Sequence, residues 1–327
     1  MELIFLGTSA AIPSKSRCLP SIALKYRSDI VLFDCGAQNL QQNFVEANLK
    51  LNNPLLIFVS HLHADHVIGI SGLLFRFKLI DRTAPVKIFG PKNFYPYFFM
   101  QRMTLGLNAD YPFSVYEIDD ENNELIEYRG LESLNPHKKS KIHDNIIFER
   151  RNYTVKYARV KHSIPTFAYS FQEKPRPGKF HPERALELGI PESRLWKTLQ
   201  TGKSITFKGK TIDPLKEGIV DPQRPGRKVT FSGDTAPCES LIELGKDSDV
   251  LIHEATFSRE LADVAAERKH STTVDAANDA KDMNAKKLFL FHISSRYEKD
   301  SQKLLTEARR IFPNTSLAED FLREKIK

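Results

Sequence analysis

Short apolar runs alternate with polar turns along most of the chain and predict many strands and several helices. Residues 3–7, 30–33 and 55–59 are apolar segments of buried-strand length, whereas residues 21–26 alternate as a half-buried strand does. Helical spacing predicts helices over residues 38–49, 67–80, 304–312 and from a Ser271 cap to Met283. Further strands are expected at residues 86–89, 153–160, 167–171, 229–231, 250–253 and 288–291. The pattern predicts an α/β protein in which residues 92–152 are hard to interpret.

One window, from about residue 174 to 228, interrupts this pattern. It holds seven of the 18 prolines and 13 Lys or Arg against 6 Asp or Glu, a surplus of 7 that equals the net charge of the whole chain. We expect an extruded, flexible arm here, with a short helix at 182–188 and a hairpin at 204–212, inserted in a single domain that spans residues 1–327. A basic arm suits a polyanionic partner, although a merely solvated surface is the alternative.

Composition narrows the class of protein. A hydrophobic content of 41% and a charged content of 27% are ordinary for a globular enzyme. The first residues lack the pattern of a signal peptide, and no apolar stretch approaches the length that crosses a bilayer, so no membrane partner is expected. Three scattered cysteines do not form a disulfide framework and favour a reducing, cytoplasmic setting.

The densest chemical signal is the segment His61-Leu62-His63-Ala64-Asp65-His66, which follows a predicted strand. On an extended segment, His61 and His63 point to the same side and can bind one ion together. The following turn redirects Asp65 and His66 toward a second position. Imidazole and carboxylate ligands suit zinc, with manganese or iron as alternatives.

Four residues cannot complete two coordination spheres, so further ligands are expected at the ends of other strands. His162, Asp234 and His292 each follow a predicted strand. Asp34 also follows one and is a better candidate for a carboxylate that orients a ligand. Each of these residues alone would more often be structural, but together they supply the missing ligands.

The order of these residues resembles the metallo-β-lactamase superfamily. That resemblance implies an αββα four-layer sandwich of two mixed sheets. It also implies two zinc ions per subunit, with Asp234 shared between them. The implied ligands are His61, His63, His162 and Asp234 for the first ion and Asp65, His66, Asp234 and His292 for the second.

Finer motifs resemble the ribonuclease Z family within this superfamily. They include Phe5-Leu6-Gly7-Thr8, His253-Glu254-Ala255-Thr256, His270-Ser271-Thr272 and Pro175-Arg176-Pro177-Gly178-Lys179-Phe180. The resemblance implies an endoribonuclease that removes the 3′ trailer of precursor tRNA. It further implies a homodimer in which the arm of one subunit grips the tRNA for the active site of its partner.

The resemblance also implies roles for individual residues. Asp65 is the expected proton acceptor and His270 the expected general acid, with a capping or core histidine as the alternative for His270. Glu254 either orients His270 or forms a structural ion pair. The expected tRNA contacts are Lys15, Arg17, Thr256, Arg176 and Lys179.

Two departures from the family pattern concern substrate recognition. Cys18 stands where asparagine is usual, and Glu192-Ser193-Arg194 follows Pro191 where a Gly-Pro pair often occurs. The alternative functions are a related zinc phosphodiesterase or 3′-exonuclease, for which the same ligands would serve, and a non-catalytic tRNA-binding module. The presence of all seven ligands argues against the last.

Overall fold

A computed structural model describes residues 1–36 and 39–327 of the chain. Its contacts divide the chain into two compact units. The larger unit comprises Met1–Glu149, Thr154–Phe171 and Lys228–Lys327. The smaller unit comprises Arg150–Tyr153 and Gln172–Arg227, which contains most of the predicted arm. Nowhere in the described ranges is a helix both long and apolar enough to span a membrane.

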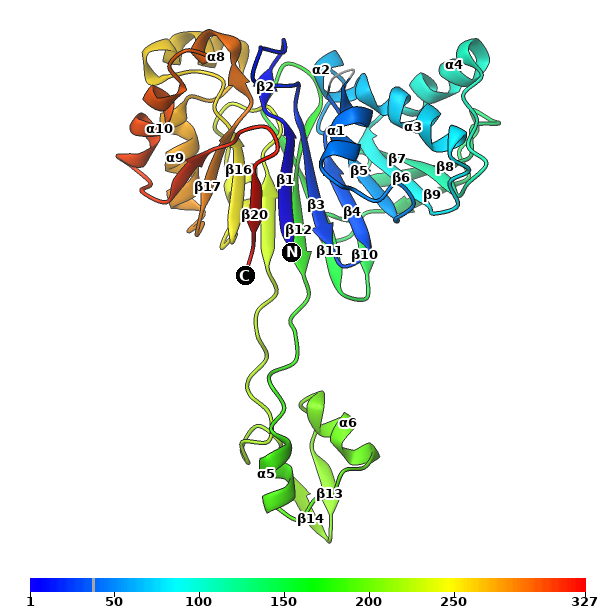
Figure 1. Cartoon of the computed structure of the whole chain (residues 1–327), viewed down its shortest axis with the longest axis vertical. Helices are drawn as coiled ribbons and strands as arrows, with labels where there is room; N and C mark the ends of the chain where they lie inside the picture. The colour runs from blue at the N-terminus through cyan, green and yellow to red at the C-terminus, as the bar shows by residue number, and fades with distance from the viewer. Residues whose placement is uncertain (37–38) are drawn as a thin grey trace. The chain divides into compact units, whose positions relative to one another are not determined.

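Two mixed sheets form the centre of the larger unit (Figure 1). The first sheet has, from edge to edge, the strands β20 (Arg323–Lys325), β1 (Glu2–Gly7), β3 (Ser21–Tyr26), β4 (Asp29–Phe33), β5 (Leu55–Phe58), β6 (Val86–Pro91), β7 (Phe113–Asp119), β8 (Glu124–Arg129) and β9 (Lys138–Lys141). The second sheet has the strands β10 (Ile146–Arg150), β11 (Tyr153–Val160), β12 (Thr166–Glu173), β15 (Lys228–Phe231), β16 (Val250–Glu254), β17 (Leu288–Phe291) and β19 (Thr315–Leu317). Aromatic pairs such as Phe33 with Phe231 and Phe58 with Tyr169 join the two sheets.

Helices cover the outer faces of both sheets and complete the four layers. Those that belong with the first sheet are α1 (Leu40–Glu46), α2 (Ala64–Val67), α3 (Gly69–Leu79) and α4 (Tyr95–Leu105). Those that belong with the second are α7 (Glu239–Gly245), α8 (Ala262–Arg268), α9 (Thr273–Asp282) and α10 (Ser301–Arg309), and the short 3-10 helices are η1 (Arg259–Leu261) and η2 (Ser295–Tyr297). Phe44 and Phe77 bury against the first sheet, and Ala276 and Leu304 against the second. Burial of these apolar faces is the main force that holds the layers together.

Parallel pairing explains where functional residues gather. Strands β4, β5 and β6 are parallel neighbours in the first sheet, as are β15, β16 and β17 in the second. Parallel strands end at the same edge of a sheet, where the following loops lie close together. The segments that follow β4, β5, β15, β16 and β17 therefore present their side chains at one end of each sheet.

Some predicted elements differ from the structure. The first helix was expected from Gln38, which lies outside the described residues, to Leu49; its described part ends at Glu46 because Asn48 has a left-handed backbone (φ 53°). The cap of α9 is Thr272, whose side chain exchanges hydrogen bonds with Asp275, and not Ser271. Strand β3 is almost fully buried, not half-buried, because it lies in the interior of the first sheet. Residues 92–152 contain α4 and the strands β7 to β10.

The smaller unit has its own apolar core. It contains α5 (Pro182–Glu187), α6 (Arg194–Gln200) and the hairpin of β13 (Ile205–Phe207) and β14 (Lys210–Ile212), and α6 was not predicted. The core residues are Ala185, Ile190, Leu199, Ile205 and Ile219. The two chain segments that lead to this core form a stem. They pair through backbone hydrogen bonds in both directions between Arg176 and Arg224 (2.9 Å each). Gly178 permits this close approach, since a Cβ there would meet the carbonyl oxygen of Asp221 at 1.8 Å.

Candidate metal centre

Two histidines after β5 and one after β11 form the first group of candidate ligands. The segment that carries His61 and His63 is extended, and it aims both rings to one side. His61 Nε2 lies 2.9 Å from His63 Nδ1, and His162 Nε2 lies 3.4 Å from the same atom. Asp234 Oδ2 lies 3.8 Å from His61 Nε2. Zinc ligands at about 2.0–2.2 Å in a tetrahedron are separated by about 3.3–3.6 Å. The three histidines lie close enough together to hold one ion, and Asp234 adjoins them through His61.

The second group forms because helix α2 starts directly after His63. That helical turn moves Asp65 and His66 away from the first position. His66 Nε2 lies 3.4 Å from Asp65 Oδ2 and 3.5 Å from Asp234 Oδ2. His292 Nε2 lies 3.4 Å from Asp234 Oδ2 and 3.7 Å from Asp65 Oδ2. Asp234 Oδ2 thus faces both groups and can be shared by two ions.

Unpartnered nitrogen atoms support a metal at the second position. The Nε2 atoms of His66 and His292 are buried, and within the described residues neither has a hydrogen-bond partner. A buried polar atom without a partner is costly, and a bound cation would remove that cost. His292 also has a left-handed backbone (φ 56°), which is uncommon outside glycine. The residues present therefore fit a pair of metal ions.

Hydrogen bonds to the opposite ring nitrogen orient several of these histidines. His66 Nδ1 donates to Asp34 Oδ2 (2.7 Å), and His162 Nδ1 donates to the carbonyl oxygen of Lys269 (3.0 Å). The Ser60 hydroxyl donates to Asp34 (2.8 Å) and accepts from His61 Nδ1 (2.9 Å). In each case Nε2 is left free to bind a metal. Neither the Ser60 contact nor the Lys269 carbonyl has a signature in the sequence.

Thr256 belongs to this orienting network. The residue is only 6% exposed. Its hydroxyl donates to Glu254 Oε2 (2.6 Å) and accepts from His292 Nδ1 (2.8 Å). The tRNA contact expected of Thr256 stays a prediction; within the protein, its hydroxyl already has one acceptor and one donor as partners. The structure makes Thr256 a support for His292.

The buried Glu254 and the half-buried His270 form a pair beside the two groups of ligands. His270 Nδ1 lies 2.8 Å from Glu254 Oε1 and 4.0 Å from Asp234 Oδ2. Burial by itself lowers the pKa of His270, but the charge and hydrogen bond of Glu254 outweigh it and raise this pKa to about 9. Bound metal cations would lower it again. Glu254 thus favours the protonated form of the ring, which is the form that a general acid requires.

The ionisation of most candidate ligands suits metal binding. His66 is the exception: burial lowers its pKa, but the carboxylates of Asp234 and Asp34 outweigh burial and raise it well above its ordinary value. Burial lowers the pKa of His61, His63 and His162, which keeps these rings neutral. The pKa of Asp65 and that of Asp234 lie well below the ordinary value: the nearby histidines outweigh the effect of burial and keep both carboxylates charged. Neutral imidazole and ionised carboxylate are the forms that bind metal.

The remaining predicted tRNA contacts lie in different surroundings. Lys15 is exposed on the loop that follows β2 (Ser9–Ala10). Arg17 is 8% exposed, and its guanidinium donates inward to Thr8 Oγ1 (2.6 Å) and to the Ala318 carbonyl (2.5 Å). This geometry makes Arg17 a support of the loop. Arg176 is half-buried in the stem of the smaller unit, and Lys179 is exposed there.

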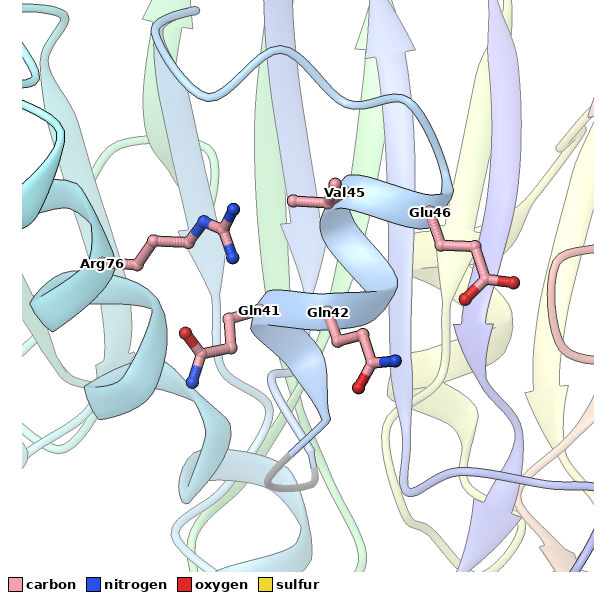
Figure 2. A pocket seen from close by; sticks show the side chains of 5 residues that line it. All are labelled: Gln41, Gln42, Val45, Glu46 and Arg76. Atoms are coloured by element: carbon pink, nitrogen blue, oxygen red, sulfur yellow. The ribbon is translucent and has the colours of Figure 1, made fainter.

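A separate hollow of about 430 Å³ lies between α1 and α3 (Figure 2). Its lining residues are Gln41, Gln42, Val45, Glu46 and Arg76. Arg76 reaches from α3 toward α1 in this view. These five residues include no histidine or cysteine, so the hollow is not a second metal site of the same kind.

The fold and the histidine–aspartate cluster define the class of the protein: it has the metallo-β-lactamase fold, with a candidate metal centre at the ends of its strands. The metallo-β-lactamase fold protein YhfI from Bacillus subtilis matches it with a TM-score of 0.65 at 14% identity, and 99% of each chain is covered. Human tRNase Z, short form, matches with a TM-score of 0.66 at 25% identity over 100% of both chains.

Relatives in sequence are more specific than the fold. Ribonuclease Z of Methanosarcina mazei is 37% identical over 98% of this chain and 97% of its own. Ribonuclease Z of Nitrosopumilus maritimus is 36% identical over 100% of both chains. A family model described as Anti-Pycsar protein Apyc1 matches residues 1–173. The chain therefore belongs to the ribonuclease Z family and, through residues 1–173, to the family that this model describes.

Proposed function

We propose that the protein is a zinc-dependent endoribonuclease that removes the 3′ trailer of precursor tRNA and leaves a 3′-hydroxyl on the tRNA. The observation that carries this proposal is its similarity, over the full length of both chains, to relatives named ribonuclease Z. The cluster of candidate ligands and the basic arm supply the chemistry and the RNA affinity that this reaction needs.

The test is incubation of the purified protein with a precursor tRNA that carries a 3′ extension. We expect a mature-length tRNA with a 3′-hydroxyl and a trailer with a 5′-phosphate, each as a single species. A ladder of products shortened from the 3′ end would instead indicate an exonuclease. No RNA cleavage together with hydrolysis of small diesters would indicate a small-molecule phosphodiesterase.

The residues at the centre can each be given a part in this reaction. Two zinc ions, when bound, would acidify a water molecule and stabilise the charge that develops on the phosphate. Asp65 accepts the proton of the attacking water. The water oxygen bonds to phosphorus as the bond to the 3′ oxygen of the tRNA breaks. His270 protonates that departing oxygen, and Glu254 holds the ring in place.

We expect two zinc ions per chain, held by the residue sets that the superfamily resemblance implies. Elemental analysis of the purified protein should find about two zinc per chain, and His292→Ala should reduce this toward one. Removal of the metal by a chelator should lower the melting temperature, because the bound ions stabilise the folded state and the half-buried Asp65 and buried Asp234 lose the cations that offset their charge. Full activity with one zinc or none would contradict this assignment.

Glu254→Gln tests whether Glu254 tunes His270 for catalysis. The neutral amide should let the pKa of His270 fall from about 9 toward its ordinary value of about 6.5. Because the acid is active only below its pKa, the alkaline side of the pH–rate profile should move to lower pH. At pH 8 we expect tRNA cleavage to fall by roughly 10- to 100-fold.

A substrate with a good leaving group separates this role from a structural one. Nitrophenolate departs without a proton, so hydrolysis of bis(p-nitrophenyl) phosphate by Glu254→Gln should change little. An equal loss on both substrates, or an unshifted pH profile, would show that the Glu254–His270 pair serves the fold instead.

The assembly and location of the protein are further parts of the proposal. We propose a homodimer in which the arm of one subunit binds tRNA for the centre of the other. Cys18, Cys35 and Cys238 are free thiols, which agrees with the cytoplasmic setting that we propose.

A further inference from the structure

The loop from Ala11 to Cys18 lies at the edge of the metal centre and is anchored at both ends. At its start, the Ala11 N–H donates to Asp65 Oδ2 (3.0 Å), so the loop touches a candidate ligand directly. At its end, the Cys18 N–H donates to Asp320 Oδ2 (2.6 Å). Arg17, turned inward as described above, strengthens this end. The tip between these anchors, Ser14 to Ser16, carries the exposed Lys15.

Glu298 binds the tip of this loop. Its Oε1 accepts hydrogen bonds from the backbone N–H groups of Lys15 (2.9 Å) and Ser16 (3.3 Å). The Ser14 hydroxyl also hydrogen-bonds to this carboxylate, and together these bonds hold the pKa of Glu298 below its ordinary value. Glu298 is itself exposed, so it contributes to the loop and not to the core.

The segment that carries Glu298 begins at a candidate metal ligand. His292 is followed by β18 (Ile293–Ser294), which pairs with β2 at the start of the loop. Helix η2 comes next, and Glu298 follows it. One short segment therefore contacts the loop at its base and at its tip, and it links the position of Lys15 to that of His292.

The loop also lines a hollow of about 360 Å³ together with Asn39, Asp320 and Phe321. This volume is within the range of about 300–1,000 Å³ typical of ligand sites. Two cationic residues line the hollow, and the guanidinium of Arg17 is turned inward. Lys15 is therefore the lining cation that is available to a phosphate group of an RNA.

We propose that Glu298 is a positioning residue, which holds the Ser14–Ser16 tip so that Lys15 meets the RNA at the entrance to the metal centre. This inference rests on the proposed function, since it assigns Glu298 a part in binding the same RNA substrate. Without Glu298 the tip loses its hydrogen-bond acceptor, and the ordering of Lys15 must then come from the RNA itself.

Steady-state cleavage of a 3′-extended precursor tRNA by Glu298→Ala tests this role. We expect KM to rise by roughly tenfold while kcat stays within about twofold, because binding is impaired and the reacting groups are not. Glu298→Gln retains an oxygen that accepts both N–H groups and should recover much of the lost affinity. Glu260→Ala is the matched control, since Glu260 is an exposed acid whose carboxylate pairs with Lys303.

A double substitution shows whether Glu298 acts through Lys15. If it does, Lys15→Ala with Glu298→Ala should raise KM no more than Lys15→Ala alone, because the second change removes nothing further. The inference would be overturned if the two substitutions had additive effects on KM, or if Glu298→Ala left KM for precursor tRNA unchanged. It would also be overturned if Glu298→Ala lowered kcat equally on precursor tRNA and on bis(p-nitrophenyl) phosphate. A wild-type protein that cleaves no precursor tRNA would instead overturn the proposed function.

Discussion

Replacing Asp65 with alanine is expected to abolish cleavage of precursor tRNA and to leave tRNA binding almost unchanged. Asp65 Oδ2 lies 3.4 Å from His66 Nε2 and 3.7 Å from His292 Nε2, at the centre of the second group of ligands. The substitution removes a candidate zinc ligand and the proposed proton acceptor together. General-base catalysis alone contributes about 10²- to 10⁴-fold, so we expect kcat to fall by at least about 10³-fold.

Binding and metal content distinguish the possible reasons for such a loss. Affinity for precursor tRNA, measured by filter binding, should stay within about threefold of wild type. The basic arm is untouched, and Glu298 and Asp320 still hold the Lys15 loop after its Ala11 contact with Asp65 is lost. Zinc content should fall toward one ion per chain. Asp282→Ala, which removes an exposed acid at the end of α9, is the control and should behave as wild type. If the Asp65 variant bound tRNA poorly, a structural role would explain its inactivity better.

Removing the arm is expected to lower cleavage of precursor tRNA strongly, as Asp65→Ala does, but to leave hydrolysis of small phosphodiesters intact. The stem offers a place to cut, because Arg176 and Arg224 are paired by backbone hydrogen bonds in both directions. Residues 177–223 can therefore be replaced by an Asn-Gly turn, which joins paired antiparallel strands without strain. The deletion removes the exposed cations Lys179, Arg184, Arg194, Lys197, Lys203, Lys208, Lys210 and Lys216.

We expect kcat/KM for precursor tRNA to fall by at least about 100-fold, with hydrolysis of bis(p-nitrophenyl) phosphate retained. Loss of phosphate contacts should also make the remaining tRNA affinity less dependent on salt concentration. Retention of both activities would contradict the role of the arm in tRNA binding. Loss of both would point to a disturbed larger unit, which thermal melting of the shortened chain would reveal.

Mixing the two variants tests whether the arm acts on the partner subunit. The Asp65→Ala chain keeps its arm, and the shortened chain keeps its metal centre. If each arm serves the other subunit, a mixed dimer has one complete site, and activity should reappear after the two variants are allowed to exchange subunits. No recovery, with mixed dimers present, would indicate that each arm serves its own centre.

Hydrophobic patterning predicted the elements that have strong local signals. Strand β17 matches the expected residues 288–291. Helix α9 forms where it was expected, but its cap is Thr272 in place of Ser271. Residues 92–152 were hard to interpret because some of their elements lack such a pattern. Strand β9 reads Lys-Lys-Ser-Lys and is fully exposed, so it exists because β8 offers it hydrogen bonds and not because it has an apolar face. Helix α4 begins with an aromatic run around Pro96 that has no clear helical periodicity.

The sequence by itself determined which residues are candidates for the metal centre. Spacing alone identified His61, His63, Asp65 and His66, because their geometry depends on a strand end and one turn of helix. His162, Asp234 and His292 were reached by a more general rule, namely that the end of a strand can present a side chain rigidly. Resemblance to a known superfamily supplied their division between two ions.

Only the tertiary structure decided how those residues are supported. Thr256 and Arg17 are polar residues in motifs, and the sequence could not tell that their polar atoms are engaged inside the protein. Ser60 meets Asp34 because β4 pairs with β5, and Glu298 meets the loop because β18 pairs with β2. The Lys269 carbonyl meets His162 because the end of α8 packs against the segment after β11. The physical reason is that a ligand's identity is a local property of the chain, whereas the direction of its hydrogen bonds depends on which distant backbone packs against it.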